Sequence, residues 1–182
     1  MITKPHKVSE KEIYRGRKIS LKIEEYMIND VKFKVEKVEH PGAVVIIPVG
    51  EEDNIIYLKQ YRAPIDKWII ELPAGTIKEN EEIEETAKRE LLEEVGYETD
   101  NLTLIGSIYP SPGYSSEILY IFVARNLVKS KPKREPHEIL IVEKAPLKDL
   151  LDMVYENKIK DAKTIAALIL YSKVNNKILK LE

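Results

Sequence analysis

The feature of this sequence that most limits its fold is a single amphipathic helix set within a long series of short β-prone runs. Four apolar residues repeat every four positions in residues 81–95 and form one stripe along this predicted helix: Ile83, Ala87, Leu91 and Val95. Asn80 is the expected N-cap, and Gly96 is expected to take the left-handed conformation that ends the helix.

Strand signals surround this helix. Alternating apolar and polar residues predict half-buried strands at 12–14, 19–23 and 31–35, with a hairpin turn at Asn29 and Asp30 inside residues 21–38. The other expected strands are the deeply buried runs 43–49 and 55–58, then 68–72, 102–109, 118–124 and 139–143. Helices are expected at 147–156 and 161–174, the second with a stripe of Ile165, Leu168, Ile169 and Ser172. Strands therefore dominate before helices close the chain.

The composition excludes several classes of protein. A length of 182 residues suits one catalytic domain, and a formal net charge of −2 is too small to indicate a nucleic-acid-binding face. The chain has no cysteine, which excludes disulfides, zinc–thiolate sites and thiol nucleophiles. It has neither a long apolar stretch nor a signal-peptide centre, so we expect a cytoplasmic protein without a membrane partner. Abundant Lys and Glu give the hypothesis of a thermophilic source.

Acidic residues are concentrated in one segment. Residues 78–98 hold nine acidic and three basic side chains, a net charge of −6. Glu93 and Glu94 lie in the last turn of the predicted helix, where the helix dipole disfavours carboxylates. On a helical projection these two and Glu90 lie beside the apolar stripe, where their repulsion requires a compensating cation. Oxygen ligands on one face suit Mg²⁺ or Mn²⁺; the alternative is a solvated acidic face, or one that serves a partner protein.

The spacing within this segment matches a known signature. Gly75, five residues, Glu81, seven residues and then Arg89-Glu90-Leu91-Leu92-Glu93-Glu94-Val95-Gly96-Tyr97 resembles the signature of the Nudix hydrolases, with Tyr97 in a slot usually held by an aliphatic residue. The resemblance implies an α/β (α+β) fold, namely an α/β/α sandwich around a mixed β-sheet with an extra N-terminal antiparallel strand region. It also implies hydrolysis that depends on divalent cations.

Roles follow from the resemblance for each matching position. It implies that Glu90, Glu93, Glu94 and the Ala74 carbonyl hold two or three Mg²⁺ or Mn²⁺ ions, with Glu93 also a candidate base through a bound water. Arg89 and Glu81 are expected to form a supporting ion pair. For Glu81 alone, ordinary first-turn charge is the alternative.

Segments outside the signature resemble the ADP-ribose pyrophosphatase subfamily: residues 38–43, 60–62, 71–75 and 111–117. The resemblance implies hydrolysis of the pyrophosphate of ADP-ribose, or of a related nucleoside diphosphate sugar, to AMP and ribose 5-phosphate. In that subfamily the N-terminal strands exchange across a homodimer and help to hold the adenine. We therefore expect residues 1–41 to serve substrate binding and dimerisation and residues 42–182 to form the Nudix hydrolase domain.

The same resemblance implies further substrate-binding residues. Arg62 is expected to contact a phosphate through its planar guanidinium, the alternative being a plain surface arginine. Arg17 and Glu36 are expected near the base, with a solvent-facing role as the alternative for either. Glu117 is expected to bind the ribose or to support a metal ligand.

A carboxylate from a late loop commonly completes catalysis in the subfamily. Glu138 fits the usual placement better than Glu135, and His137 is an alternative base that is otherwise simply solvated. Two rival functions are also compatible with the sequence. One is a Nudix hydrolase of GDP-mannose, FAD or a diadenosine polyphosphate, and the other is a non-catalytic nucleotide-binding Nudix module.

Overall fold

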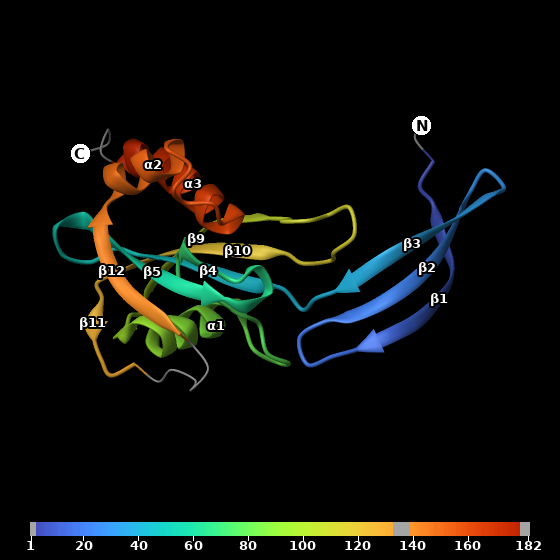
Figure 1. Cartoon of the computed structure of the whole chain (residues 1–182), viewed down its shortest axis with the longest axis horizontal. Coiled ribbons are helices and arrows are strands. Elements are labelled where there is room, and N and C mark those ends of the chain that lie inside the picture. The colour runs from blue at the N-terminus through green and yellow to red at the C-terminus, as the bar shows by residue number, and fades with distance from the viewer. Residues whose placement is uncertain (1–2, 133–138, 179–182) are drawn as a thin grey trace. The chain divides into compact units, whose positions relative to one another are not determined.

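The computed structural model describes residues 3–132 and 139–178 (Figure 1). The chain divides into two compact units. The first comprises Met1–Gly42 with Tyr109–Ile118, and the second comprises Ala43–Ile108 with Leu119–Glu182. A short segment from the middle of the sequence thus belongs with the N-terminal strands.

The first unit is built on one antiparallel sheet. Its strands β1 (His6–Arg15), β2 (Ser20–Ile28) and β3 (Val31–Glu39) lie in that order in the sheet. The predicted hairpin turn is confirmed, because Asn29 and Asp30 join β2 to β3 with φ angles of 46° and 63°. The prediction of half-buried strands is wrong for β1, whose residues are all exposed, and for most of 31–35, where only Val35 is partly buried. Half-burial needs a second layer against one face, and alternation alone does not supply that layer.

The loop of the first unit is fixed to the end of β3. The Val38 amide donates to the Tyr114 carbonyl at 2.8 Å, and the Ser116 amide donates to the Val38 carbonyl at 3.0 Å. The Ser116 hydroxyl also accepts a hydrogen bond from the His40 amide at 3.0 Å. These contacts explain why residues 109–118 belong to this unit.

The second unit contains two larger sheets. A mixed sheet has the order β7 (Ala74–Thr76), β4 (Ala43–Pro48), β10 (Leu119–Arg125) and β9 (Asn101–Ile108), in which only β4 and β10 are parallel. An antiparallel sheet has the order β12 (Leu140–Pro146), β5 (Asn54–Arg62) and β6 (Lys67–Glu71). The remaining short elements are β8 (Tyr97–Glu98) with β11 (Val128–Lys129), and the 3₁₀ turns Glu51–Asp53 and Ala63–Ile65.

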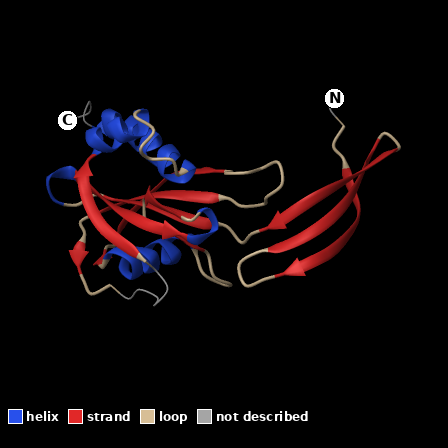
Figure 2. Cartoon of the chain, viewed as in Figure 1, coloured by secondary structure: helices blue, strands red, loops and turns tan. Residues whose placement is uncertain are grey.

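Helices cover both faces of these sheets. Figure 2 shows α1 (Ile83–Glu90) on one side and α2 (Leu147–Tyr155) with α3 (Ala162–Ile178) on the other. Strand β4 is buried on both faces, because Val44 and Ile46 pack into the core cluster under α1 whereas Val45 and Ile47 pack under α2 and α3. This explains the uninterrupted apolar run at 43–49 and confirms the expected α/β/α sandwich.

The acidic helix differs from its prediction at its start and in its last turn. Its N-cap is Glu82, which forms a capping box with Glu85, so the prediction of Asn80 is wrong. Asn80 instead adopts a φ angle of 60° in the turn before the helix. Leu91–Val95 form a π-helical turn rather than a continuation of the α-helix. Gly96 ends the helix with a φ angle of 74°, as predicted.

The buried face of α3 also differs from its prediction. The fully covered residues are Thr164, Ala167, Leu168 and Tyr171, whereas Ile169 is 43% exposed. A polar contact helps to fix the rotation of the helix, because the Thr164 hydroxyl accepts a hydrogen bond from the Leu72 amide at 2.8 Å. Of the expected stripe, Leu168 is buried, Ile165 packs against the core and Ser172 is partly exposed, so the prediction is wrong chiefly at Ile169. The inward Thr164 carries no apolar signal, so the pattern could not indicate it.

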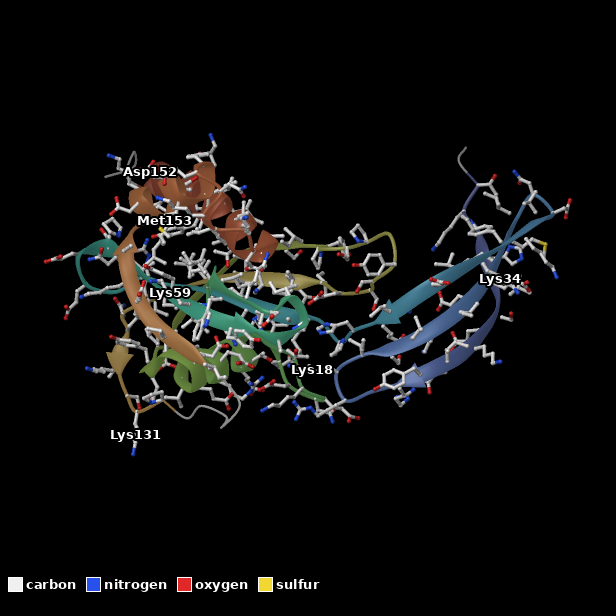
Figure 3. All side chains as sticks on the ribbon, viewed as in Figure 1. Lys18, Lys34, Lys59, Lys131, Asp152 and Met153 are labelled. Carbon is white, nitrogen blue, oxygen red and sulfur yellow. The ribbon has the colours of Figure 1, made fainter. Side chains whose placement is uncertain are left out.

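Helix α2 has one exposed and one inward-facing side. On α2, Asp152 is exposed while its neighbour Met153 packs against the core, and both side chains are labelled in Figure 3. Among the helices of the described residues, none combines the length and the apolar character needed to cross a membrane.

Candidate active site

Three carboxylates and one strand form the centre of the candidate site. Glu90 ends α1, and Glu93 and Glu94 lie in the π-helical turn. Glu90 and Glu94 are buried, with 7% and 3% exposure, whereas Glu93 is partly exposed. The Ala74 amide of β7 donates to Glu94 Oε2 at 3.0 Å, so the strand and the helix are joined directly.

Gly75 makes room for one of these carboxylates. A Cβ atom at Gly75 would lie 1.9 Å from the carboxyl carbon of Glu90, far inside contact distance. Glycine is therefore required at position 75 because a side chain would collide with Glu90. A left-handed backbone conformation is not the reason. The Glu90 carboxylate occupies the volume that any other residue at position 75 would fill.

Arg89 forms hydrogen bonds to three acidic side chains, Glu81, Glu90 and Glu93, which are called the acidic group below. Its Nε and Nη2 atoms donate to the two oxygens of Glu81 at 2.7 and 2.9 Å, and Nη2 also donates to the Thr76 carbonyl at 3.1 Å. Its Nη1 atom donates to Glu90 and, at 3.1 Å, to Glu93 Oε2. The expected ion pair of Arg89 with Glu81 is therefore present. The hydrogen bonds to Glu81 are the main reason why the pKa of Arg89 is raised above its ordinary value.

Glu81 provides a test of this arrangement by acid unfolding. Its pKa is lowered to about 2, mainly by the hydrogen bonds from Arg89 and further by those from the Lys78 amide and the Thr86 hydroxyl. A lowered pKa stabilises the folded state above the ordinary value of 4.5, and that stability is lost as the pH falls towards 2. We expect this group to contribute on the order of 2 kcal/mol to the loss of unfolding free energy across that window.

Urea unfolding followed by circular dichroism between pH 6 and pH 2.5 measures this contribution. The Glu81→Gln variant should lose part of the acid dependence, whereas Glu84→Gln, at an exposed position of the same helix, should keep it. Equal acid dependence in Glu81→Gln and the wild type would contradict the structural role assigned to Glu81.

The donor set fits a hard divalent cation. Across residues 3–132 and 139–178, no three acidic or histidine side chains are already gathered tightly enough to hold an ion. Glu90 and Glu93 are turned towards Arg89, and Glu94 towards the Ala74 amide. The set nevertheless consists of oxygen donors only, and Gly75 provides the space in which the Glu90 carboxylate lies. A cation would therefore compete with Arg89 for carboxylates that are already close to it.

Arg62 is engaged in a buried ion pair. Its Nε and Nη2 atoms donate to the two oxygens of Glu71 at 2.6 and 2.7 Å. The expectation for Arg62 was contact with a phosphate, and its Nε–Nη2 edge is instead occupied by Glu71. Within residues 3–132 and 139–178, the hydrogen bonds of the Arg62 side chain do not involve Nη1.

The other expected substrate residues lie in the first unit. Arg17 is exposed between β1 and β2, and Glu36 of β3 lines a hollow of about 520 Å³ together with Tyr114. Glu117 Oε1 lies 3.8 Å from Nδ1 of His40. That Nδ1 also accepts a hydrogen bond from the Gly42 amide at 3.0 Å.

The late-loop carboxylates lie outside the described residues. This concerns Glu135 and Glu138, and also His137. Their expected roles stay predictions.

Sequence reasoning missed two residues next to the signature, Glu71 and Lys163. Glu71 has an almost fully buried carboxylate, and Lys163 at the start of α3 donates to it. The two positions are 92 residues apart, so no local spacing indicates their contact. The sole signal was a glutamate at the end of a β-prone run, directly before the Leu72-Pro73-Ala74 segment.

Comparison with known proteins decides the family. The family model described as the NUDIX domain matches residues 39–168, which is more than half of the chain. The chain belongs to the NUDIX family. The resemblance inferred from the sequence is confirmed.

Individual relatives match most of the chain. It is 40% identical over 164 residues to the ADP-ribose pyrophosphatase of Bacillus subtilis (strain 168), covering 88% of this chain and 89% of that protein. It is 34% identical, with the same coverage, to the methanol dehydrogenase activator of Bacillus methanolicus. The ADP compounds hydrolase NudE of Escherichia coli (strain K12) is 29% identical over 128 residues, with coverage of 70% and 68%.

A solved structure also matches this NUDIX chain. The crystal structure of an ADP compounds hydrolase superposes with a TM-score of 0.85 at 24% identity, and the match covers 97% of each chain. At this identity the match shows a shared fold. It includes the N-terminal strands as well as the sandwich.

Proposed function

We propose that this protein hydrolyses the pyrophosphate of ADP-ribose, or of a closely related nucleoside diphosphate sugar, to AMP and ribose 5-phosphate. The observation that carries the proposal is the Nudix signature, with Glu81, Glu90 and Glu93 joined by Arg89, in a chain 40% identical to an ADP-ribose pyrophosphatase over 88% of its length. A module that only binds nucleotides has no need for three carboxylates in this arrangement.

Divalent cations complete the proposed site. We propose Glu90, Glu93, Glu94 and the Ala74 carbonyl as the groups that hold two or three Mg²⁺ or Mn²⁺ ions. The proposal is supported by the all-oxygen donor set and by the space at Gly75. Such ions supply Lewis-acid charge that neutralises pyrophosphate oxygens and makes a water molecule more acidic.

The chain's own residues orient the reaction. We propose that Glu93, the most exposed of the three carboxylates, accepts the proton of the attacking water. Water then forms the new P–O bond, the bridging P–O bond breaks, and the departing phosphate takes the electron pair. Arg89 holds the base from one side and is itself fixed by Glu81. Glu138, or Glu135 beside it, remains the alternative base proposed from the family resemblance.

Substrate contacts are proposed for the remaining residues. Arg62 would donate to a phosphate through its Nη1 edge. Arg17 and Glu36 would lie near the base and Glu117 near the ribose, as the family resemblance implies. We also propose a cytoplasmic location.

A substrate panel tests the specificity. Turnover is measured with Mg²⁺ for ADP-ribose, GDP-mannose, FAD and a diadenosine polyphosphate. We expect kcat/KM for ADP-ribose to exceed each of the others by about tenfold or more, which is the discrimination that a shaped pocket supplies. A higher value for GDP-mannose would contradict the ADP-ribose assignment while leaving the Nudix chemistry intact.

A homodimer is proposed as the working form. The N-terminal sheet exposes large apolar side chains, among them Ile13 at 47%, Tyr14 at 59% and Phe33 at 38%. Exposed apolar side chains gathered on one sheet are typical of an interaction surface, and a second copy would cover them. Light scattering should therefore give twice the chain mass of 21.0 kDa.

A charge placed on this sheet tests the dimer. Tyr14→Asp should shift the mass towards the monomer, whereas Lys11→Asp, at an exposed polar position of the same strand, should leave the dimer intact. A monomeric mass for the wild type at assay concentrations would contradict the proposal.

A further inference from the structure

A charged cluster lies next to the signature but contains none of its residues. The carboxylate of Glu71 at the end of β6 is 1% exposed and receives donors from two directions. Arg62 at the end of β5 donates to both oxygens at 2.6 and 2.7 Å, and Lys163 on α3 donates to Oε2. Lys163 also lies 3.0 Å from Asp161, the residue that caps α3. The cluster therefore holds two cations and two anions.

The charge state of the cluster follows from these contacts. Burial alone would raise the pKa of Glu71, but the hydrogen bonds from Arg62 and the charge of Lys163 outweigh burial and lower it. The pKa of Arg62 is raised, mainly by Glu71 and further by the charges of Glu94 and Asp161. Arg62 therefore lies within electrostatic reach of the signature carboxylate Glu94.

The backbone beside Glu71 leads directly into the site. Leu72 donates its amide to the Thr164 hydroxyl at 2.8 Å, and that hydroxyl donates to Asp161 at 2.6 Å. Two residues further on, the Ala74 amide donates to Glu94 at 3.0 Å. The start of α3 is thus connected to the signature by a short run of fixed groups.

Exposure increases from Glu71 through Lys163 to Arg62, so the cluster runs from the interior to the surface. The side chain of Glu71 is 1% exposed and that of Lys163 is 17% exposed, whereas that of Arg62 is 38% exposed. Arg62 is thus the member of this cluster whose charged end reaches furthest into solvent. A fold that needed only to neutralise Glu71 would require one partner, because the bidentate contact with Arg62 already satisfies both oxygens.

We propose that Glu71 and Lys163 are positioning residues for phosphate binding: Lys163 holds the Glu71 carboxylate, which in turn holds the Arg62 guanidinium with its Nη1 edge available to the pyrophosphate. The proposal rests on the proposed function and names the device that prepares its phosphate contact. An arginine side chain loses considerable rotamer freedom when it binds a ligand, and prior fixing by Glu71 removes that cost from binding. The cluster thus acts on affinity rather than on the chemical step.

A double-mutant cycle tests whether Lys163 acts on phosphate binding through Arg62. The variants are Lys163→Met, Arg62→Met and the double variant, and binding of ADP-ribose in EDTA is measured by calorimetry. We expect Lys163→Met to weaken binding about tenfold, the effect of one charge-assisted hydrogen bond, but less than about twofold when Arg62 is already Met. Turnover with cations should show the same rise in KM with kcat changed by less than about threefold.

Two further measurements keep the result interpretable. Lys163→Arg retains the charge and should restore affinity to within about threefold, and Lys163→Gln replaces Lys163→Met in the cycle if the latter does not fold. Inorganic pyrophosphate serves as a second probe, because it needs only the phosphate-binding groups. Wild-type protein that binds pyrophosphate but not ADP-ribose would defeat the proposed function. The same double-mutant cycle, measured with pyrophosphate, would then decide this inference.

Two outcomes would overturn the inference. Equal weakening by Lys163→Met in the presence and absence of Arg62 would show that Lys163 acts independently of Arg62. Unchanged binding of both probes in a folded Lys163→Met variant would show that the cluster only joins α3 to β6.

Discussion

Replacement of Glu93 by Gln is expected to lower kcat for ADP-ribose by about a thousandfold while the protein stays folded, in line with the loss of a general base. The Glu93 side chain is 29% exposed and accepts a single hydrogen bond from Arg89 at 3.1 Å. A glutamine of the same shape can still accept that bond, but it cannot take up a proton and binds cations poorly. Steady-state kinetics together with a thermal melt measures both parts of the prediction.

The matched control for Glu93 is Glu84→Gln. Glu84 is an exposed glutamate on α1 and lies outside the acidic group around Arg89. Its replacement should leave kcat within about twofold of the wild type, as expected for a surface substitution. Near-normal turnover by Glu93→Gln would refute the role of that residue and move the base to the late-loop carboxylates.

Gly75→Ala is also expected to lower activity strongly, because it displaces the Glu90 carboxylate rather than removing a base. The new Cβ would lie 1.9 Å from the Glu90 carboxyl carbon, so the carboxylate must move away from β7. A side-chain end can rotate at modest cost, so we expect the fold to persist while kcat/KM falls by about a hundredfold or more. The cation concentration for half-maximal activity should rise at the same time.

Gly106→Ala is the control for this glycine. A Cβ atom at Gly106 on β9 would meet its nearest neighbour at 3.6 Å, an ordinary contact distance. The variant should retain the activity of the wild type. A Gly75→Ala protein with normal cation dependence would contradict the assignment of Glu90 to the cation site.

Local sequence patterns predicted much of the fold. The hairpin at Asn29 and Asp30 and the helix end at Gly96 were predicted correctly because each depends on a left-handed backbone conformation that few residues favour. The two-sided burial of β4 follows from its uninterrupted apolar run. These features need no knowledge of distant contacts.

Three features of the helices were not predicted, and one of them depends on a partner far away in the sequence. The helix starts at a Glu82 cap rather than at Asn80, because the Glu82 and Glu85 side chains satisfy each other's backbone amides. The π-helical turn at Leu91–Val95 has no signal in a pattern read with a period of 3.6 residues. The face of α3 is turned by the contact between Thr164 and Leu72, which joins residues 92 positions apart.

In the candidate site, too, some contacts were predicted from the sequence and others were not. The carboxylates of the signature and the pairing of Arg89 with Glu81 were expected from their spacing, and the structure contains that pair. The pairing of Arg62 with Glu71 was not expected, since a guanidinium at the end of a strand gives no indication of which carboxylate it meets. The sequence therefore predicted a local ion pair within the signature, whereas the partner of Arg62 is seen only in the structure.

The most direct test of the account is the fate of ADP-ribose incubated with the purified protein. Products are separated by chromatography after incubation with Mg²⁺ and, in parallel, with excess EDTA. We predict AMP and ribose 5-phosphate in equal amounts with Mg²⁺ and no cleavage with EDTA. Absence of cleavage of ADP-ribose and of every other nucleoside diphosphate derivative in the presence of Mg²⁺ would contradict the central claim.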